Sequence, residues 1–181
     1  MATVVVLNGV SSAGKSSIAR AIQQQGRCDF VRVALDDFIA MVPIGREAAP
    51  EWFVIRAYSD GATQKVSYTN GPRGGALLAA MRKFVGVIAD QGIDVVVDDV
   101  FTADEARDYR TILSRHRLLV VKVDADIQQV AEREKNRGDR LIGLASDQAE
   151  RIHAGIDYDL TVLNNDGQVE ACARQILDAL E

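Results

Sequence analysis

The sequence predicts an α/β fold built on a parallel β-sheet, and two observations support this prediction. Five short apolar runs of strand length alternate along the chain with segments of helical periodicity. The first run leads into a glycine- and serine-rich loop that is followed by a helical segment. Because the runs are apolar on both faces, they suit strands buried in a parallel sheet, and we expect a three-layer arrangement with flanking helices.

The expected strands are the β-branched apolar runs, namely 3–7, 30–35, 93–97, 118–123 and 160–163. Helical spacing appears after the first run and twice more, at Ile18, Ala19 and Ile22, at Leu77, Met81, Phe84 and Ile88, and at Val169, Ala173, Ile176 and Leu180. Each set predicts one apolar stripe that covers a face of the sheet.

Residues 42–73 break this alternation, since proline and glycine punctuate them. Runs at 54–58 and 66–68, with 59–61 between them, predict a small hairpin. We interpret this insertion as a substrate-facing flap, because it is too small to hold a core of its own. Trp52 and Phe53 either wall an apolar substrate pocket or cap the edge of the core.

Composition predicts one domain over residues 1–181 and restricts the class of protein. The net charge of −5 and the pI of about 5.1 disfavour a nucleic-acid binder, since acidic residues interrupt the nearest basic stretch, 133–140. Its apolar runs are too short to span a bilayer, and the N-terminus lacks the basic start of a signal peptide. Two cysteines, Cys28 and Cys172, make neither a disulfide framework nor a zinc site. We expect a cytoplasmic monomer or homodimer that binds neither membranes nor nucleic acid.

Residues Gly9–Ser16 fit the P-loop pattern G-x-x-x-x-G-K-[ST]. Gly9 and Gly14 let the backbone wrap so that its N–H groups point at phosphate oxygens. Lys15 supplies a positive charge to the β- and γ-phosphates, and the Ser16 hydroxyl is a ligand for Mg²⁺. The residues expected to bind the nucleotide in this loop are Gly9, Val10, Ser11, Ser12, Ala13, Gly14, Lys15, Ser16 and Ser17.

Two acidic pairs follow expected strands, where ligands of parallel sheets bind. Asp36 is the first residue after the second expected strand and is our candidate general base for an attacking hydroxyl. We expect Asp37 to be the N-cap of a short helix. The alternative is that both are caps or surface charges. Asp98 ends a run that resembles a Walker B strand and is the candidate metal ligand, while Asp99 either reaches the substrate or supports the loop. The sequence leaves open which of the two faces the metal.

Arginines four residues apart, Arg133 and Arg137, share one helix face and precede Arg140. We interpret residues 133–143 as a lid whose arginines bind the nucleotide and neutralise charge on a transferred phosphoryl group. The alternative is a solvated helix face that pairs with Glu132 and Glu134. The residues expected to act in catalysis are Asp36, Lys15, Arg133 and Arg137.

These motifs, in order, resemble those of the chloramphenicol phosphotransferases over nearly the whole chain. The likeness rests on the P-loop segment 7–16, on 97–101, on Asp36 after 33–35, and on 137–140 with Gly143, Ala145, Gln148, His153, Tyr158 and Asp159 downstream. The resemblance implies a five-stranded parallel sheet in the order 2-3-1-4-5, and transfer of the γ-phosphate of ATP to a hydroxyl of chloramphenicol with Asp36 as base. It also implies that Lys15 and Ser16 hold ATP and Mg²⁺ and that Arg133 and Arg137 belong to a lid.

The insertion matches that family only loosely at 47–52, so the expected reaction carries over better than the acceptor. A kinase of another metabolite, such as a nucleotide or a sugar, shares every ATP-site residue and differs only in the acceptor pocket. A non-catalytic nucleotide switch is a third possibility. The guanine-reading pattern Asn-Lys-x-Asp is absent, and Lys122-Val123-Asp124 does not supply it, which favours adenine.

Overall fold

The structure is a computed structural model that describes residues 1–181 except 26–28, 61–62, 138–142, 150 and 166, and only the backbone of 59–60, 63–65 and 137. The elements in chain order are β1 (Thr3–Asn8), α1 (Lys15–Gln24), β2 (Val31–Ala34), α2 (Leu35–Ile39), β3 (Phe53–Asp60), β4 (Thr63–Asn70), α3 (Pro72–Asp90), β5 (Val95–Asp99), α4 (Ala103–Ile112), β6 (Arg117–Asp124), α5 (Ile127–Arg137), α6 (Leu144–Ala149), β7 (Leu160–Leu163) and α7 (Val169–Asp178).

Five of the strands form one parallel sheet in the order β2-β5-β1-β6-β7, which confirms the predicted order 2-3-1-4-5 of its strands along the chain. In the register of the central strand, Val5 of β1 lies beside Val96 of β5 and Leu119 of β6. Because β1 is central, the loop that follows it emerges at the middle of the carboxyl edge of the sheet. The ends of β2 and β5 lie at the same edge.

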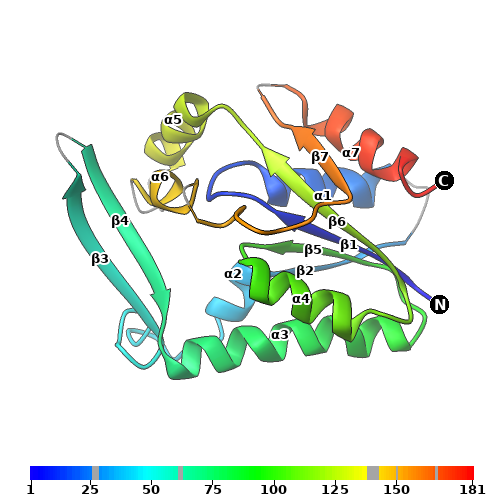
Figure 1. Ribbon diagram of the computed structural model, residues 1–181, viewed down its shortest axis with the longest axis horizontal. Coiled ribbons are helices and arrows are strands. Elements are labelled where there is room, and N and C mark those ends of the chain that lie inside the picture. The colour runs from blue at the N-terminus through cyan, green and yellow to red at the C-terminus, as the bar shows by residue number, and fades with distance from the viewer. Residues whose placement is uncertain (26–28, 61–62, 138–142, 150, 166) are drawn as a thin grey trace.

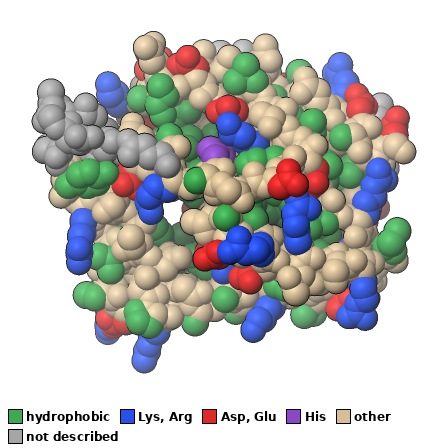
Figure 2. Space-filling view, viewed as in Figure 1, with side chains coloured by type: hydrophobic (Ala, Val, Ile, Leu, Met, Phe, Trp, Pro, Cys, Tyr) green, Lys and Arg blue, Asp and Glu red, His purple; other side chains and the backbone are tan. Residues whose placement is uncertain are grey.

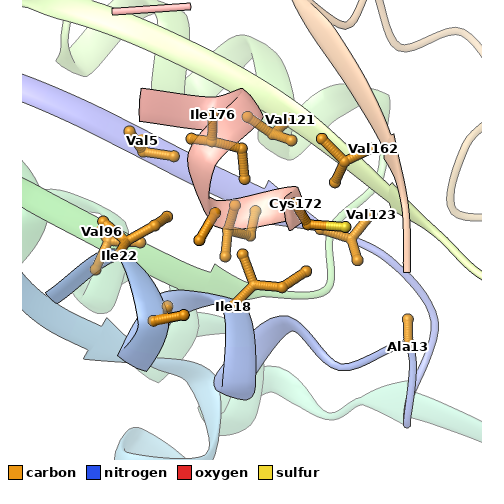
Figure 3. Close-up of a cluster of buried hydrophobic side chains, with 14 of the residues drawn as sticks. Val5, Ala13, Ile18, Ile22, Val96, Val121, Val123, Val162, Cys172 and Ile176 are labelled. Atoms are coloured by element: carbon orange, nitrogen blue, oxygen red, sulfur yellow. The ribbon is translucent and has the colours of Figure 1, made fainter. Parts of the chain in front are cut away.

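Helices cover both faces of the sheet, as the apolar strands predict (Figure 1). Val5 and Leu7 of β1 pack toward α1 and α7, where Ile18, Ile22 and Ile176 complete one core (Figure 3). The alternate residues Val4 and Val6 of β1 belong to a second core under α3 and α4. Strand residues alternate between faces, so a strand buried on both sides must be apolar throughout.

Helix α3 differs in phase from the prediction. Its fully buried residues include Leu78, Met81, Val85 and Ala89, whereas in the predicted stripe only Met81 is fully buried, and Leu77 and Ile88 are partly buried against the hydrophobic clusters. Phe84 is 47% exposed. Both stripes have helical spacing. The face of α3 that contains Val85 and the buried Gly86 packs closely against α4, since a Cβ at Gly86 would lie only 2.6 Å from Ile112, and this contact fixes which face is buried.

The insertion contains the predicted hairpin, with β3 and β4 antiparallel and Ile55 opposite Tyr68. The hairpin projects away from the main sheet, beside α6 (Figure 1). Its base packs on α3 through a small cluster in which Val42, Phe53 and Leu78 are buried. Among the residues that the structure describes, no helix has the length and apolar character needed to cross a bilayer.

Two details at the carboxyl edge differ from the prediction. Helix α2 starts directly after β2 with Ala34 at its N-cap, so the assignment of Asp37 as the N-cap was wrong. Asp36 and Asp37 lie in the first helical turn, where the positive end of the helix dipole favours carboxylates. Strand β5 also extends through Asp98 and Asp99, which therefore belong to the strand itself.

Candidate active site

The loop between β1 and α1 has a tightly wound backbone. Ser12 and Gly14 take positive φ angles of 60° and 94°. A side chain at either predicted glycine would also collide, since a Cβ on Gly9 would lie 2.5 Å from the Val123 carbonyl oxygen and one on Gly14 would lie 2.0 Å from Asn164 Nδ2. The two glycines are therefore required by contacts with the ends of β6 and β7 as well as by the winding of the loop.

The cation and the hydroxyl of the loop both form hydrogen bonds at the carboxyl edge of the sheet. Lys15 Nζ donates to the carbonyl oxygens of Gly9 and Val10 at 2.8 and 3.1 Å, and only 6% of the residue is exposed. Ser16 Oγ donates to Asp98 Oδ2 at 2.5 Å. Asp98 is therefore the acidic residue of its pair that faces the loop, and its carboxylate lies beside the Ser16 hydroxyl.

Asp99 points in the opposite direction, because successive strand residues alternate between faces. Its Oδ2 accepts from Tyr109 Oη at 2.8 Å and its Oδ1 accepts from the Val100 N–H at 2.7 Å. Burial raises the pKa of this carboxyl to about 6, although the hydrogen bonds oppose the shift. Only 1% of Asp99 is exposed and it does not line the large cavity, so its placement fits support of the loop, and the prediction of substrate contact finds no geometric basis.

A cavity of about 630 Å³ lies between the loop, α2, the hairpin and α6. It opens as a hollow on the face shown in Figure 2, with charged side chains around it. Asp36 is exposed and lines this cavity together with Lys15, Ser16 and Asp98. The apolar part of its wall includes Leu35, Ile39, Phe53, Ile55 and Leu78. The volume is in the range of sites for drug-sized ligands.

The two predicted aromatic residues separate. Phe53 lines the cavity, while Trp52 does not and packs instead beside the cluster at the hairpin base. The Arg73 guanidinium lies 6.0 Å from the Trp52 ring, and the Trp52 carbonyl accepts from the Gly71 N–H at 2.7 Å. Phe53 thus fits the pocket-wall interpretation and Trp52 fits the alternative, the edge of the core.

Helix α6 lines the cavity next to the loop, and side-chain hydrogen bonds hold it in this position. Gln148 Oε1 accepts from the Ser11 N–H at 2.6 Å, and Tyr58 Oη of the hairpin donates to Asp147 Oδ1 at 2.9 Å. The Glu134 carboxylate accepts from the N–H groups of Gly143 and Ala145 at 3.1 and 3.0 Å. The sequence predicted none of these contacts, because they join separate segments of the chain. Only the family resemblance pointed to Gln148.

A second cavity of about 310 Å³ lies on the other side of the loop and shares Ser12 and Gly14 with the first. Arg133 lines it and donates to the Asn164 carbonyl at 3.2 Å. Asn164 Nδ2 donates to the Ala13 carbonyl at 2.7 Å, while its buried Oδ1 has no hydrogen-bond partner among the described residues. Sequence reasoning missed Asn164, whose only signal is two polar residues directly after the last strand.

The predicted lid is described in part. Arg133 belongs to the second cavity, and the structure does not bring it to the wall of the first. The side chain of Arg137 and all of Arg140 lie outside the described residues. The participation of these arginines in phosphoryl transfer therefore stays a prediction.

Comparisons with known proteins agree on the kind of protein. The family model described as "Chloramphenicol phosphotransferase-like protein" matches residues 2–181. A Mycobacterium tuberculosis (strain H37Rv) protein named "Putative O-phosphotransferase Rv2636" is 27% identical over 184 residues, which cover 98% of this chain and 82% of that protein.

Solved kinase structures share the fold. A gluconokinase from Sinorhizobium meliloti 1021 has a TM-score of 0.67 and 20% identity, with 98% of this chain and 91% of that chain covered. The Mycobacterium tuberculosis APS kinase in complex with AMPPNP and APS has a TM-score of 0.64 and 17% identity, with 99% and 97% covered. At these identities the likeness shows the fold, and the chemistry must be argued from the site.

Proposed function

The chain belongs to the chloramphenicol phosphotransferase-like family, and on that premise we propose that it moves the γ-phosphate of ATP to a hydroxyl of a chloramphenicol-like small molecule. The coarser activity, a kinase-like phosphotransferase, follows from the family. The observation that supports the proposal is one cavity whose wall joins Asp36 to Lys15, Ser16 and Asp98. A base for a hydroxyl and groups for a phosphate thus face the same space.

The phosphate end of the site is the loop itself. Its backbone N–H groups and the N-terminus of α1 point positive partial charge at an anion, and Lys15 adds a full charge. The second cavity borders the same residues Ser12 and Gly14, so a nucleotide with its phosphates on the loop would place its nucleoside there. Kinase-fold proteins that bind AMPPNP support the use of a nucleotide.

The oxygen cluster of Ser16 and Asp98 fits Mg²⁺. This cation prefers hard oxygen ligands and is commonly held by one or two protein groups in addition to substrate phosphates and water. The hydroxyl and the carboxylate oxygen lie 2.5 Å apart, so both can face one ion after a small adjustment. When bound, Mg²⁺ would neutralise charge that develops on the transferred phosphoryl group.

The acceptor end is Asp36 with the apolar wall. In the proposed step the acceptor oxygen forms a bond to the γ-phosphorus, and the bond from that phosphorus to the bridging oxygen of ADP breaks. The proton of the acceptor hydroxyl passes to the Asp36 carboxylate, and ADP leaves with the electron pair of the broken bond. Lys15 and the loop N–H groups stabilise the negative charge throughout.

The test is Mg²⁺-dependent release of ADP from ATP, with and without chloramphenicol, by the wild-type chain and by Asp36→Asn. We expect chloramphenicol to stimulate release, and Asp36→Asn to lower the stimulated kcat by about 10²–10⁴-fold while the KM for ATP stays unchanged. The matched control is Asp37→Asn, since Asp37 pairs with Arg32 at 3.0 Å and does not line the cavity. Equal rates for Asp36→Asn and the wild type would contradict the assignment of the base.

A kinase of another metabolite is the second candidate, because the insertion that borders the acceptor space matched the family only loosely. Solved proteins of this fold include a gluconokinase and a shikimate kinase in complex with shikimate. Release of ADP that chloramphenicol does not stimulate, but another alcohol does, would select this candidate. A nucleotide switch would instead hydrolyse ATP at one rate whatever alcohol is added.

A further inference from the structure

Tyr68 of β4 carries a buried hydroxyl that has no role in the proposed reaction. Its Oη has no hydrogen-bond partner among the described residues, although the residue lines the large cavity. Tyr68 pairs across the hairpin with Ile55, which also lines the cavity. Directly paired residues of two strands point to the same face, so this face of the hairpin is turned toward the acceptor space.

The ring of Tyr68 is held in place by stacking on Phe53, with centroids 5.2 Å apart and an angle of 22° between the rings. A fixed ring cannot turn its hydroxyl out to water without loss of this contact. A buried hydroxyl without a partner costs free energy, and native structures retain such groups mainly where they serve a function. The position therefore suits a group that a bound molecule completes.

The Tyr68 hydroxyl is a hydrogen-bond donor at any ordinary pH. Burial raises the pKa of its phenol, and the negative charge of Asp36 raises it further. Asp36 and Tyr68 also line the same cavity. A donor at Tyr68 and an acceptor at Asp36 complement a molecule that carries a hydroxyl for the carboxylate and a second oxygen for the phenol.

Charge in the cavity disfavours an anionic acceptor. Beyond Asp98, the described residues of its wall include the carboxylates of Asp36, Glu47, Asp104 and Glu105, against the cations of Lys15 and Arg151. Two of these carboxylates are in ion pairs, Asp104 with Arg107 and Glu105 with Arg82, while Asp36 and Glu47 add negative charge to the wall. Of the cations, Lys15 is held by the loop carbonyls, and Arg151 forms an ion pair with Asp147. A carboxylate or phosphate on the acceptor would meet like charges, while an uncharged or cationic molecule would not.

We propose that Tyr68 Oη donates a hydrogen bond to an oxygen of the acceptor and so positions the reacting hydroxyl beside Asp36, and that the acceptor is an uncharged or cationic alcohol with an apolar body. This inference rests on the proposed phosphotransferase function and specifies its substrate class. The apolar wall binds the body of the molecule, and Tyr68 fixes its orientation.

The experiment uses the full chain with ATP and Mg²⁺, and measures acceptor-dependent ADP release with four alcohols. Chloramphenicol is the uncharged probe, propranolol the cationic one, and shikimate and gluconate the anionic ones. With the best acceptor, kcat and KM are measured for the wild type, Tyr68→Phe and Ser67→Ala. Ser67 is the matched control, because its hydroxyl donates to the Arg56 carbonyl at 3.4 Å and does not line the cavity.

We expect an uncharged or cationic alcohol to be the best acceptor. Tyr68→Phe should raise the KM for it by about tenfold, the effect of one neutral hydrogen bond, while the KM for ATP stays at the wild-type value. The melting temperature should stay at or rise above the wild-type value, because the variant removes a buried hydroxyl without a partner among the described residues. Ser67→Ala should leave all of these values unchanged. If Tyr68→Phe only disturbed the fold, it would lower the melting temperature and change the KM values for both substrates together.

An unchanged acceptor KM in Tyr68→Phe would overturn the inference while the proposed function stands. Release of ADP stimulated only by shikimate or gluconate would also overturn the inference; it would keep the phosphotransferase activity but select the second candidate, a kinase of another metabolite. If none of the four alcohols stimulates release and Asp36→Asn turns over ATP as the wild type does, the proposed function fails together with the inference. Wild-type behaviour of Asp36→Asn therefore separates the two failures.

Discussion

The loop between β1 and α1 and the hairpin face the same cavity, but they are anchored differently. The loop joins the central strand β1 to α1, and Asn164, Gln148 and the end of β6 hold it from three other parts of the chain. The hairpin lies outside the main sheet (Figure 1). It is held at its base by the cluster around Phe53 and farther along β3 by the bond from Tyr58 to Asp147.

This difference teaches how one fold can keep its chemistry and change its substrate. Groups for the phosphate are fixed by a sheet whose core would be disturbed by any movement. Asp36 lies on α2, but the part of the acceptor wall formed by Phe53, Ile55 and Tyr68 sits on the hairpin, a separately packed element that can vary with little cost to the sheet. Changes in the loop should therefore affect ATP, and changes in the hairpin should affect the acceptor.

The largest effect is expected from Lys15→Ala. This change removes the charge that lies within the loop, and we expect kcat/KM for ATP to fall by about 10²–10³-fold. The hairpin should be undisturbed, so the exchange protection of its amide hydrogens should match the wild type. If Lys15→Ala turned over ATP with the kinetics of the wild type, the loop would have no part in the mechanism, and the proposed division between loop and hairpin would be wrong.

The next effect concerns Asp99, which anchors the edge of the sheet to α4 through Tyr109. The pKa of Asp99 is raised to about 6, against 3.8 for an ordinary aspartate. Between pH 3.8 and about 6 the native state therefore keeps a proton that the unfolded chain has lost. The stabilisation is full below pH 3.8 and is lost as the pH rises through about 6, by up to about 3 kcal/mol in the free energy of unfolding.

Urea denaturation of the wild type and of Asp99→Asn in steps from pH 4 to 7 measures this contribution. The difference between the two unfolding free energies should change over that range, whereas Asp104→Asn, at an exposed carboxylate of α4, should run parallel to the wild type. A constant difference for Asp99→Asn would show that its carboxyl is not protonated in the native state.

The smallest effect is expected at the hairpin base, where α3 has two adjacent glycines. A Cβ on Gly74 would lie 2.1 Å from the Trp52 carbonyl oxygen, while one on Gly75 would meet nothing closer than 3.8 Å. Gly74→Ala should lower the free energy of unfolding by about 1–3 kcal/mol and raise the acceptor KM, with the KM for ATP unchanged. Gly75→Ala should instead stabilise the chain by about 0.5–1 kcal/mol.

Thermal unfolding and the two KM values check this pair of variants. An increase in the KM for ATP in Gly74→Ala would show that the hairpin and the loop are coupled, and the comparison between them would need revision.

Periodicity predicted the strands, the hairpin and the helices α1, α3 and α7, but it gave no sign of α4 or α6 and left the phase of several elements open. The stripe of α3 through Leu78 and the one through Leu77 have the same spacing. In the same way, sequence could not tell whether Asp98 or Asp99 faces the loop, since either phase of a strand that is apolar on both sides is allowed. The partner elements made these choices, through the contact of Ser16 with Asp98 and of Tyr109 with Asp99.

The sequence by itself determined the phosphate-binding loop and its place after the first strand, because that chemistry lies within one continuous segment whose residues act through the backbone that they form. Only the tertiary structure decided which side chains complete the site. Asn164 reaches Ala13 and Gln148 reaches Ser11 across separations of 151 and 137 residues, and Tyr68 lines one cavity with Asp36 only because of where the hairpin packs. Such contacts depend on packing between distant segments, which no local pattern encodes.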